Sequence, residues 1–285
     1  MNINTKIAEF FNFSTSNKTV NWDDLLTTQY CGYLNKKCIK VRKSEPSISI
    51  GTCTVKYGRE NQEIIICPHR LIEKRQIFFD CIHLLTLHEP GNELHIIPEI
   101  SIPGGSVDYF FASVRDKKVI DFVGIELQTL DTTGTIWPER QRFLTSMNFL
   151  EEPADGYGDK LYGMNWKMTA KTILVQLHHK IETFEHLGKH LVLVLQDHLL
   201  NYMKKEFSFS HINSNAKTGD PMHFHSYGLT LGEDNNYHIK LKERLSTDTT
   251  GIAKAMGLQA ERKVELELII KALEKKISDL TLLSF

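Results

Sequence analysis

The sequence predicts an α/β protein in which helices flank a mixed central sheet. Three segments support this fold class: a strand meander over residues 93–128, an amphipathic helix over residues 165–186, and a near-continuous apolar run over residues 190–197. A short run that is apolar throughout is typical of a strand buried on both faces, as parallel strands are. A meander followed by a helix and such a strand indicates a mixed sheet between helices.

The individual elements follow from local signals along the chain. Pro68 suits the first turn of a helix, and the apolar residues at 71, 78, 82 and 85 would share one helical face. Strands are expected at residues 93–102, 106–114 and 119–128, with breaks at Pro103-Gly104-Gly105 and at residues 115–118. A further helix is expected from Pro138 to about Leu150.

We divide the chain into three regions. Residues 1–67 are polar and contain four of the five cysteines once Cys67 is included, with little material for a core. Residues 68–200 contain the helix, the meander, the second helix and the buried strand. Residues 201–285 contain a β-like segment at 223–231 and a closing helix near 257–278. This last helix would either serve a dimer interface or cover the core.

Composition restricts the class of protein. The chain has 285 residues, 41% of them hydrophobic, which is enough for a buried core. The formal net charge of -1 means that any surface for nucleic acid must be a local basic patch. No signal peptide and no apolar stretch of membrane-spanning length are evident, so we expect a cytoplasmic protein with no membrane partner. We find no P-loop, GxGxxG, GxSxG or HExxH motif.

Two acids on neighbouring predicted strands are the main candidates for chemistry. Strand residues alternate between faces, so Glu126 and Gln128 share a face beside Gly124. A hairpin turning at residues 115–118 would pair Asp108 near Ile125 or Glu126. Two carboxylates this close can hold Mg²⁺, which neutralises charge on a phosphodiester and lowers the pKa of an attacking water. The alternative interpretation is that Asp108 and Glu126 are ordinary acidic residues on a solvent-exposed face of the sheet, which would account for each residue taken alone.

These residues carry a resemblance to a known group of nucleases. PGGSVDYFF at 103–111 and GIELQ at 124–128 resemble the PD-(D/E)xK nuclease signature in the form where glutamine replaces lysine. CPHR at 67–70 and NWKMTAKTILVQLHHKI at 165–181 are similar to the NotI-type restriction endonuclease family, and the resemblance covers about residues 30–200. It implies a PD-(D/E)xK-type core with Asp108 and Glu126 as Mg²⁺ ligands.

The resemblance also assigns Gln128 to the position usually taken by a catalytic lysine. A neutral amide can orient a water by hydrogen bonds but supplies no positive charge. Lys167 or Lys171, on the helix that follows, are candidates for that charge. Glu99 is a candidate for an additional acid near the metal, and an exposed strand residue is an equally simple interpretation.

The N-terminal cysteines predict a structural metal module. Cys31, Cys38, Cys53 and Cys67 would form an S₄ set suited to Zn²⁺ or iron, although no CxxC pair is present. Buried thiols acting as small apolar residues are the alternative. NotI-type enzymes resemble this arrangement through a four-cysteine iron site ahead of the nuclease core, with the first two cysteines closer together. Cys81 is expected in the core.

The same region is locally basic. The basic side chains interleaved with Cys38 either form a solvated face or contact phosphates; they are Lys36, Lys37, Lys40, Arg42 and Lys43. The histidine pairs 178–179 and 223/225 are expected to be ordinary surface or core residues.

Taken together, these observations predict a Mg²⁺-dependent, sequence-specific double-strand DNA endonuclease of type II restriction character. Cutting both strands at one site implies a homodimer on a palindromic sequence. Two alternatives remain at this point: a PD-(D/E)xK nuclease in repair, nicking or antiphage defence without strict site specificity, and a non-catalytic metal–cysteine DNA-binding protein.

Overall fold

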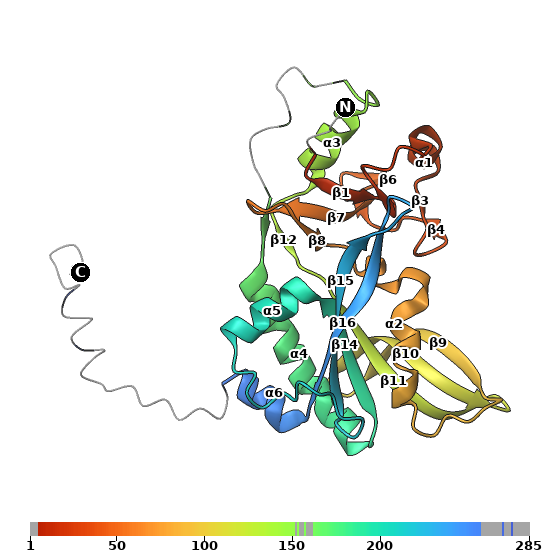
Figure 1. Cartoon of the computed structure of the whole chain (residues 1–285), viewed down its shortest axis with the longest axis vertical. Helices are drawn as coiled ribbons and strands as arrows, with labels where there is room; N and C mark the ends of the chain where they lie inside the picture. The colour runs from red at the N-terminus through yellow and green to blue at the C-terminus, as the bar shows by residue number, and fades with distance from the viewer. Residues whose placement is uncertain are drawn as a thin grey trace, which may run out of the picture.

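A computed structural model describes residues 5–151, 153, 157, 162–257, 270 and 275. Its main body is a six-stranded sheet with helices on either side (Figure 1). The closing helix expected near 257–278 lies outside the described residues apart from single positions. No helix in the described part of the chain has the length and apolar character needed to cross a membrane.

The predicted mixed sheet is confirmed. Its strands, in spatial order, are β16 (Tyr237–Thr247), β15 (Met222–Leu231), β14 (His190–Gln196), β11 (Lys118–Gln128), β10 (Gly105–Arg115) and β9 (Glu93–Ile102). β14 lies parallel to both β11 and β15, and the other pairs are antiparallel. Every residue of β14 is buried, as its unbroken apolar run predicts.

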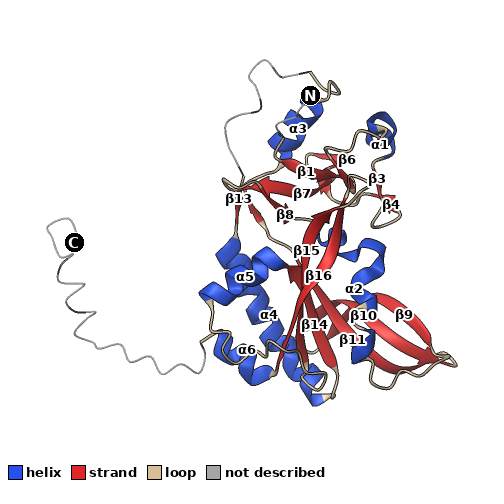
Figure 2. Cartoon of the chain, viewed as in Figure 1, coloured by secondary structure: helices blue, strands red, loops and turns tan. Residues whose placement is uncertain are grey.

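Two hydrophobic clusters lie on opposite faces of this sheet. The larger one places the long helix α4 (Trp166–His186) against β10, β14 and β15, together with α5 (Asp197–Glu206) and α6 (Thr249–Ala255). These three helices group beside the sheet in Figure 2. Gly124 permits this packing, because a Cβ there would lie 2.4 Å from the ring of Phe184 on α4.

The prediction of a regular helix that begins at Pro68 is wrong. The chain forms a 3₁₀ segment η1 (Pro68–Arg75), a short helix α2 (Gln76–Phe79) and a 3₁₀ turn η2 (Ile82–Leu84). Lys74 and Arg75 are left-handed, with φ of 48° and 58°. The apolar residues still pack on the sheet, at the smaller cluster, but irregular turns deliver them there. The later helix α3 (Trp137–Ser146) begins as predicted and ends four residues early.

The N-terminal region has its own sheet, contrary to the expectation of little core material. Its strands, in spatial order, are β2 (Phe13–Ser14), β1 (Ile7–Phe10), β7 (Thr52–Tyr57) and β8 (Gln62–Ile65). The short helix α1 (Trp22–Thr28) and α3 close over it, with Phe10 and Phe143 rings 5.4 Å apart. Short ribbons complete the region: β3 (Tyr30–Cys31) with β4 (Lys36–Lys37), and β5 (Val41–Arg42) with β6 (Glu45–Ser49). β12 (Thr132–Thr133) and β13 (Gly163–Met164) pair before α4.

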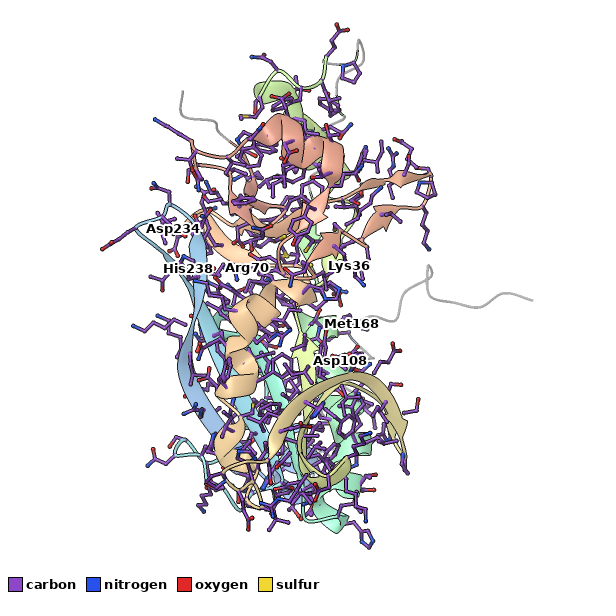
Figure 3. All side chains as sticks on the ribbon, turned by 90° about the vertical axis from the view of Figure 1, so that its right-hand side faces the viewer. Lys36, Arg70, Asp108, Met168, Asp234 and His238 are labelled. Carbon is purple, nitrogen blue, oxygen red and sulfur yellow. The ribbon has the colours of Figure 1, made fainter. Side chains whose placement is uncertain are left out.

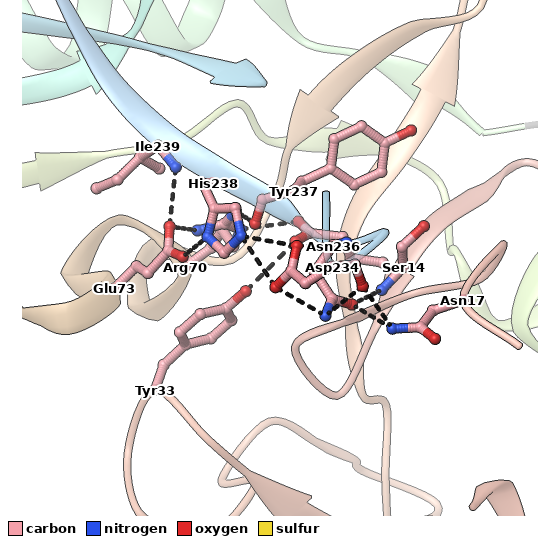
Figure 4. A network of polar contacts seen from close by, with 11 residues as sticks. Ser14, Asn17, Tyr33, Arg70, Glu73, Asp234, Asn236, Tyr237, His238 and Ile239 are labelled. Atoms are coloured by element: carbon pink, nitrogen blue, oxygen red, sulfur yellow. Dashed lines mark hydrogen bonds and ion pairs between the residues drawn. The ribbon is translucent and has the colours of Figure 1, made fainter. Parts of the chain in front are cut away.

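A buried ion-pair network joins the N-terminal sheet to the main body (Figure 4). Arg70 is fully buried, and its guanidinium donates to Glu9 Oε2 at 2.8 Å, to Glu73 Oε2 at 2.8 Å and to the carbonyl of Tyr237 at 2.7 Å. Glu73 Oε1 lies 2.6 Å from His238 Nδ1 on β16. One arginine therefore connects β1, η1 and the tip of the β15–β16 hairpin, which explains why η1 departs from helical geometry.

Two histidines are buried under the smaller cluster. His223 is 1% exposed and donates from Nε2 to the carbonyl of Asp220 at 2.8 Å, and His225 is fully buried. Among the described residues, His223 Nδ1 and His225 Nε2 have no hydrogen-bond partner. Burial, with a smaller contribution from neighbouring His190, lowers the pKa of His223 to about 4, and burial holds the pKa of His225 well below its usual value. Both rings are therefore neutral in the folded protein.

We expect His223 to make the protein acid-sensitive. An imidazole whose folded pKa is depressed stabilises the fold above its unfolded pKa of about 6.5, and this stability is lost as pH falls through 6.5 towards 4. A shift of this size corresponds to about 3 kcal/mol. Urea unfolding between pH 7.5 and pH 4.5 measures it. His223→Gln should flatten the dependence, whereas a substitution of exposed His186 should not; equal slopes in both variants would contradict the assignment.

Candidate active site

The strand register brings the two predicted acids together. Tyr109 pairs with Ile125 and Phe110 pairs with Gly124, so Asp108 and Glu126 directly follow the last pair of this ladder. Asp108 Oδ2 also accepts a hydrogen bond at 2.8 Å from the backbone N–H of Leu127. Asp108 therefore lies beside the part of β11 that carries Glu126, at the open end of the β10–β11 hairpin.

Glu126 lies on the face of the sheet that α4 covers. Phe110 and Gly124, which share that face, both pack against Phe184 of α4. From the same helix Lys180 reaches the site, with its Nζ 2.6 Å from Glu126 Oε1. The side chains of this pair are 8% and 7% exposed. Sequence reasoning missed this contact: it singled out Lys167 and Lys171, which lie exposed on the first turns of α4.

The turn between β9 and β10 packs against the aliphatic part of the Lys180 side chain. Thr183 Oγ1 donates to the carbonyl of Pro103 at 3.0 Å, and a Cβ on Gly105 would lie 3.2 Å from Lys180 Cε. Gly104 has a φ of +94°, and a Cβ there would lie 2.1 Å from the carbonyl oxygen of His179. The two glycines thus allow the turn to approach the helix backbone closely and hold the lysine from one side.

We expect Gly104→Ala to destabilise the protein more than Gly91→Ala. Gly91 has a φ of +93° and no atom within 4 Å of an added Cβ, so both substitutions carry the same backbone strain. Only the Gly104 variant adds a clash with backbone, which should cost about 1–3 kcal/mol more. Thermal unfolding of the two variants measures the difference. Equal losses would show that the turn is not tightly held against α4.

Electrostatics at the pair are dominated by burial. The pKa of Glu126 is raised to about 7, chiefly by burial and to a lesser degree by the charge of Asp108, while the hydrogen bond and the charge of Lys180 oppose the rise. Asp108 itself is exposed, which leaves one acid open to solvent and the other enclosed under α4.

The remaining predicted site residues lie near this pair. Gln128 is half-buried at the end of β11 and donates from Nε2 to the carbonyl of Thr129 at 2.6 Å, so its amide oxygen is the group left to orient a water. Glu99 lies in β9 between the pairs that flank Asp108, is exposed and has a φ of 43°. Within the described ranges no group of three or more His, Cys, Asp or Glu side chains is arranged to hold a metal, so Glu99 does not complete a triad with the two acids.

The four predicted cysteines converge on one small cavity. All are free thiols, and they line the cavity together with Lys40 and His69. The cavity has about 10 Å³ of open volume, close to what a single water needs. A hydrogen bond from Cys53 lowers the pKa of Cys67 to about 7, and Lys40 contributes. Four soft sulfur donors match the chemistry of Zn²⁺ or iron, although in the described residues they lack the close arrangement of a formed metal site. Cys81 is fully buried, as predicted.

His69 links this cavity to the acids. Its pKa is lowered by burial and by the charges of Lys36 and Lys40, and raised by Asp108, which places all three charges near one ring. In the view of Figure 3, Lys36 and Asp108 lie one above the other, with Met168 between them. Lys36 and Asp108 therefore lie on the same side of the molecule.

Comparisons with known proteins add no identity: no family model and no curated protein matches the chain.

Proposed function

We propose that this protein is a Mg²⁺-dependent, sequence-specific double-strand DNA endonuclease of type II restriction character. The observation that carries the proposal is the hydrogen bond that holds the Asp108 carboxylate beside Glu126, on the N–H of Leu127, with Lys180 bound to the buried acid. Two hard carboxylate ligands from adjacent strands suit a Mg²⁺ ion that keeps several waters. The order of meander, long helix and buried strand around them supports a PD-(D/E)xK-type core.

The residues at the pair suit phosphodiester hydrolysis. When bound, the divalent cation would supply charge neutralisation at the phosphoryl oxygens and a more acidic water. The exposed carboxylate of Asp108 and the enclosed one of Glu126 would hold the ion. The amide oxygen of Gln128 would orient the attacking water. Lys180 provides the positive charge that Gln128 lacks.

We propose that the N-terminal region grips DNA. The thiols of Cys31, Cys38, Cys53 and Cys67 would bind structural Zn²⁺ or iron and hold the basic ribbons in place. Lys36 and Lys40, close to His69 and Asp108, would contact the phosphates beside the scissile bond. Two such chains as a homodimer would present two acidic pairs to the two strands of a palindromic site.

A plasmid digest tests the function. Supercoiled mixed-sequence DNA is incubated with the protein and Mg²⁺. In the matched control Ca²⁺ replaces Mg²⁺, which should allow DNA binding without cleavage. Discrete bands with Mg²⁺ support site-specific cutting. A smear or nicked circles would instead support a nuclease in repair, nicking or defence. Retarded but intact DNA with Mg²⁺ and with Mn²⁺ would replace the proposal by a non-catalytic DNA-binding protein.

A further inference from the structure

The Lys180–Glu126 contact bears on how many metal ions the acidic pair takes. Lys180 Nζ lies 2.6 Å from Glu126 Oε1, and both side chains are almost fully enclosed. The stem of the lysine is confined by the Gly105 backbone. A surface lysine would sample many positions, but this ammonium is held in one place. The protein thus supplies a fixed monovalent cation at the carboxylate.

Each of the two acids has one oxygen committed to a protein donor. Glu126 Oε1 binds Lys180, and Asp108 Oδ2 accepts from the N–H of Leu127. Among the residues that the structure describes, this leaves Glu126 Oε2 and Asp108 Oδ1 without a protein hydrogen-bond donor. Two oxygens from two neighbouring acids are what one Mg²⁺ ion uses, since waters and substrate complete its six positions.

A second divalent ion would find too few ligands at this site, and its positive charge would be unfavourable there. In the part of the chain that the structure describes, no third acidic, histidine or cysteine side chain joins the pair in a metal-binding group. When both acids are ionised, the two carboxylates carry two negative charges, which one divalent ion balances, and Lys180 already adds a further positive charge. A second ion would be repelled by both cations in a poorly solvated site.

We propose that Lys180 occupies the place of a second cation, so that the pair binds a single divalent ion per chain. The proposal rests on the proposed function, because it takes Asp108 and Glu126 as the metal ligands. Lys180 is then a positioning residue: it orients Glu126 before metal binds and limits the occupancy of the site. A merely structural lysine would not influence how many ions bind.

Titration of the DNA-free protein with Mn²⁺ tests the proposal. Calorimetry gives stoichiometry and affinity, and the electron paramagnetic resonance of free Mn²⁺ checks both. Wild-type protein should bind one ion per chain above the background of an Asp108→Asn/Glu126→Gln double variant. Lys180→Met, similar in length and uncharged, should bind Mn²⁺ at least about tenfold more tightly or take a second ion, because the competing positive charge is gone. Lys180→Arg, which keeps the charge, should behave as wild type.

The outcomes separate the two proposals. Two ions per wild-type chain, or unchanged or weaker binding by a folded Lys180→Met protein, would overturn the role of Lys180 and leave the nuclease proposal standing. No binding above the double-variant background would overturn the metal-dependent function and this inference with it. If circular dichroism shows that Lys180→Met does not fold, the stoichiometry of the wild-type protein decides alone. One ion per chain then supports the role of Lys180, and two ions per chain contradict it.

Discussion

Replacing Asp108 by Asn, or Glu126 by Gln, should abolish DNA cleavage and leave DNA binding intact. Each change keeps the side-chain shape and removes one negative charge from the acidic pair. An amide is a poor ligand for Mg²⁺, so the rate should fall by about 10³-fold or more. DNA affinity should stay within a few fold or rise slightly, because a charge that repels phosphate is lost.

The measurement pairs a cleavage assay with an affinity measurement in Ca²⁺. Asp116→Asn is the matched control, because Asp116 lies exposed in the turn at the other end of the β10–β11 hairpin. It should cleave at the wild-type rate. Glu99→Gln should also retain most activity, since Glu99 forms no metal-binding group with the pair. Full cleavage by either acid variant would remove the site assignment.

The second large effect concerns stability, and we expect Arg70→Met to lower the free energy of unfolding by about 3–5 kcal/mol. Arg70 is fully buried and binds Glu9, Glu73 and the carbonyl of Tyr237. Methionine fills much of the space but leaves the enclosed carboxylate of Glu9 without its cation. Burial already raises the pKa of Glu9 against the lowering effect of Arg70, which shows how poorly this carboxylate is solvated.

Urea unfolding at pH 7.5 measures the loss. Arg59→Met, at an exposed turn, is the matched control and should change stability by less than about 0.5 kcal/mol. Combining Arg70→Met with Glu9→Gln should recover part of the loss, because no unpaired charge then remains buried. A loss below 1 kcal/mol for Arg70→Met alone would mean that the network does not join the N-terminal sheet to the main body.

Local signals in the sequence were enough to predict the strands of the sheet and the two candidate acids. Residue alternation along strands and a hairpin turn at 115–118 predict that Asp108 and Glu126 lie on neighbouring strands, and the register of β10 and β11 brings both residues to the open end of the hairpin. The near-continuous apolar run at 190–197 predicts a strand buried on both faces, and β14 is buried along its whole length. Both inferences depend on backbone geometry over a few residues. The spacing of apolar and polar residues in the sequence follows from that geometry, so it can be used to predict it.

Tertiary structure alone decided which lysine reaches the acids and how the N-terminal half is built. Lys167, Lys171 and Lys180 are equivalent as sequence, but the contact of Gly124 with Phe184 and the glycine turn against His179 set the rotation of α4, and only Lys180 then faces Glu126. The helical periodicity after Pro68 was likewise overridden, because Arg70 and Glu73 are drawn into ion pairs with residues far along the chain. These choices depend on long-range packing and charge pairing, which spacing within one segment does not encode.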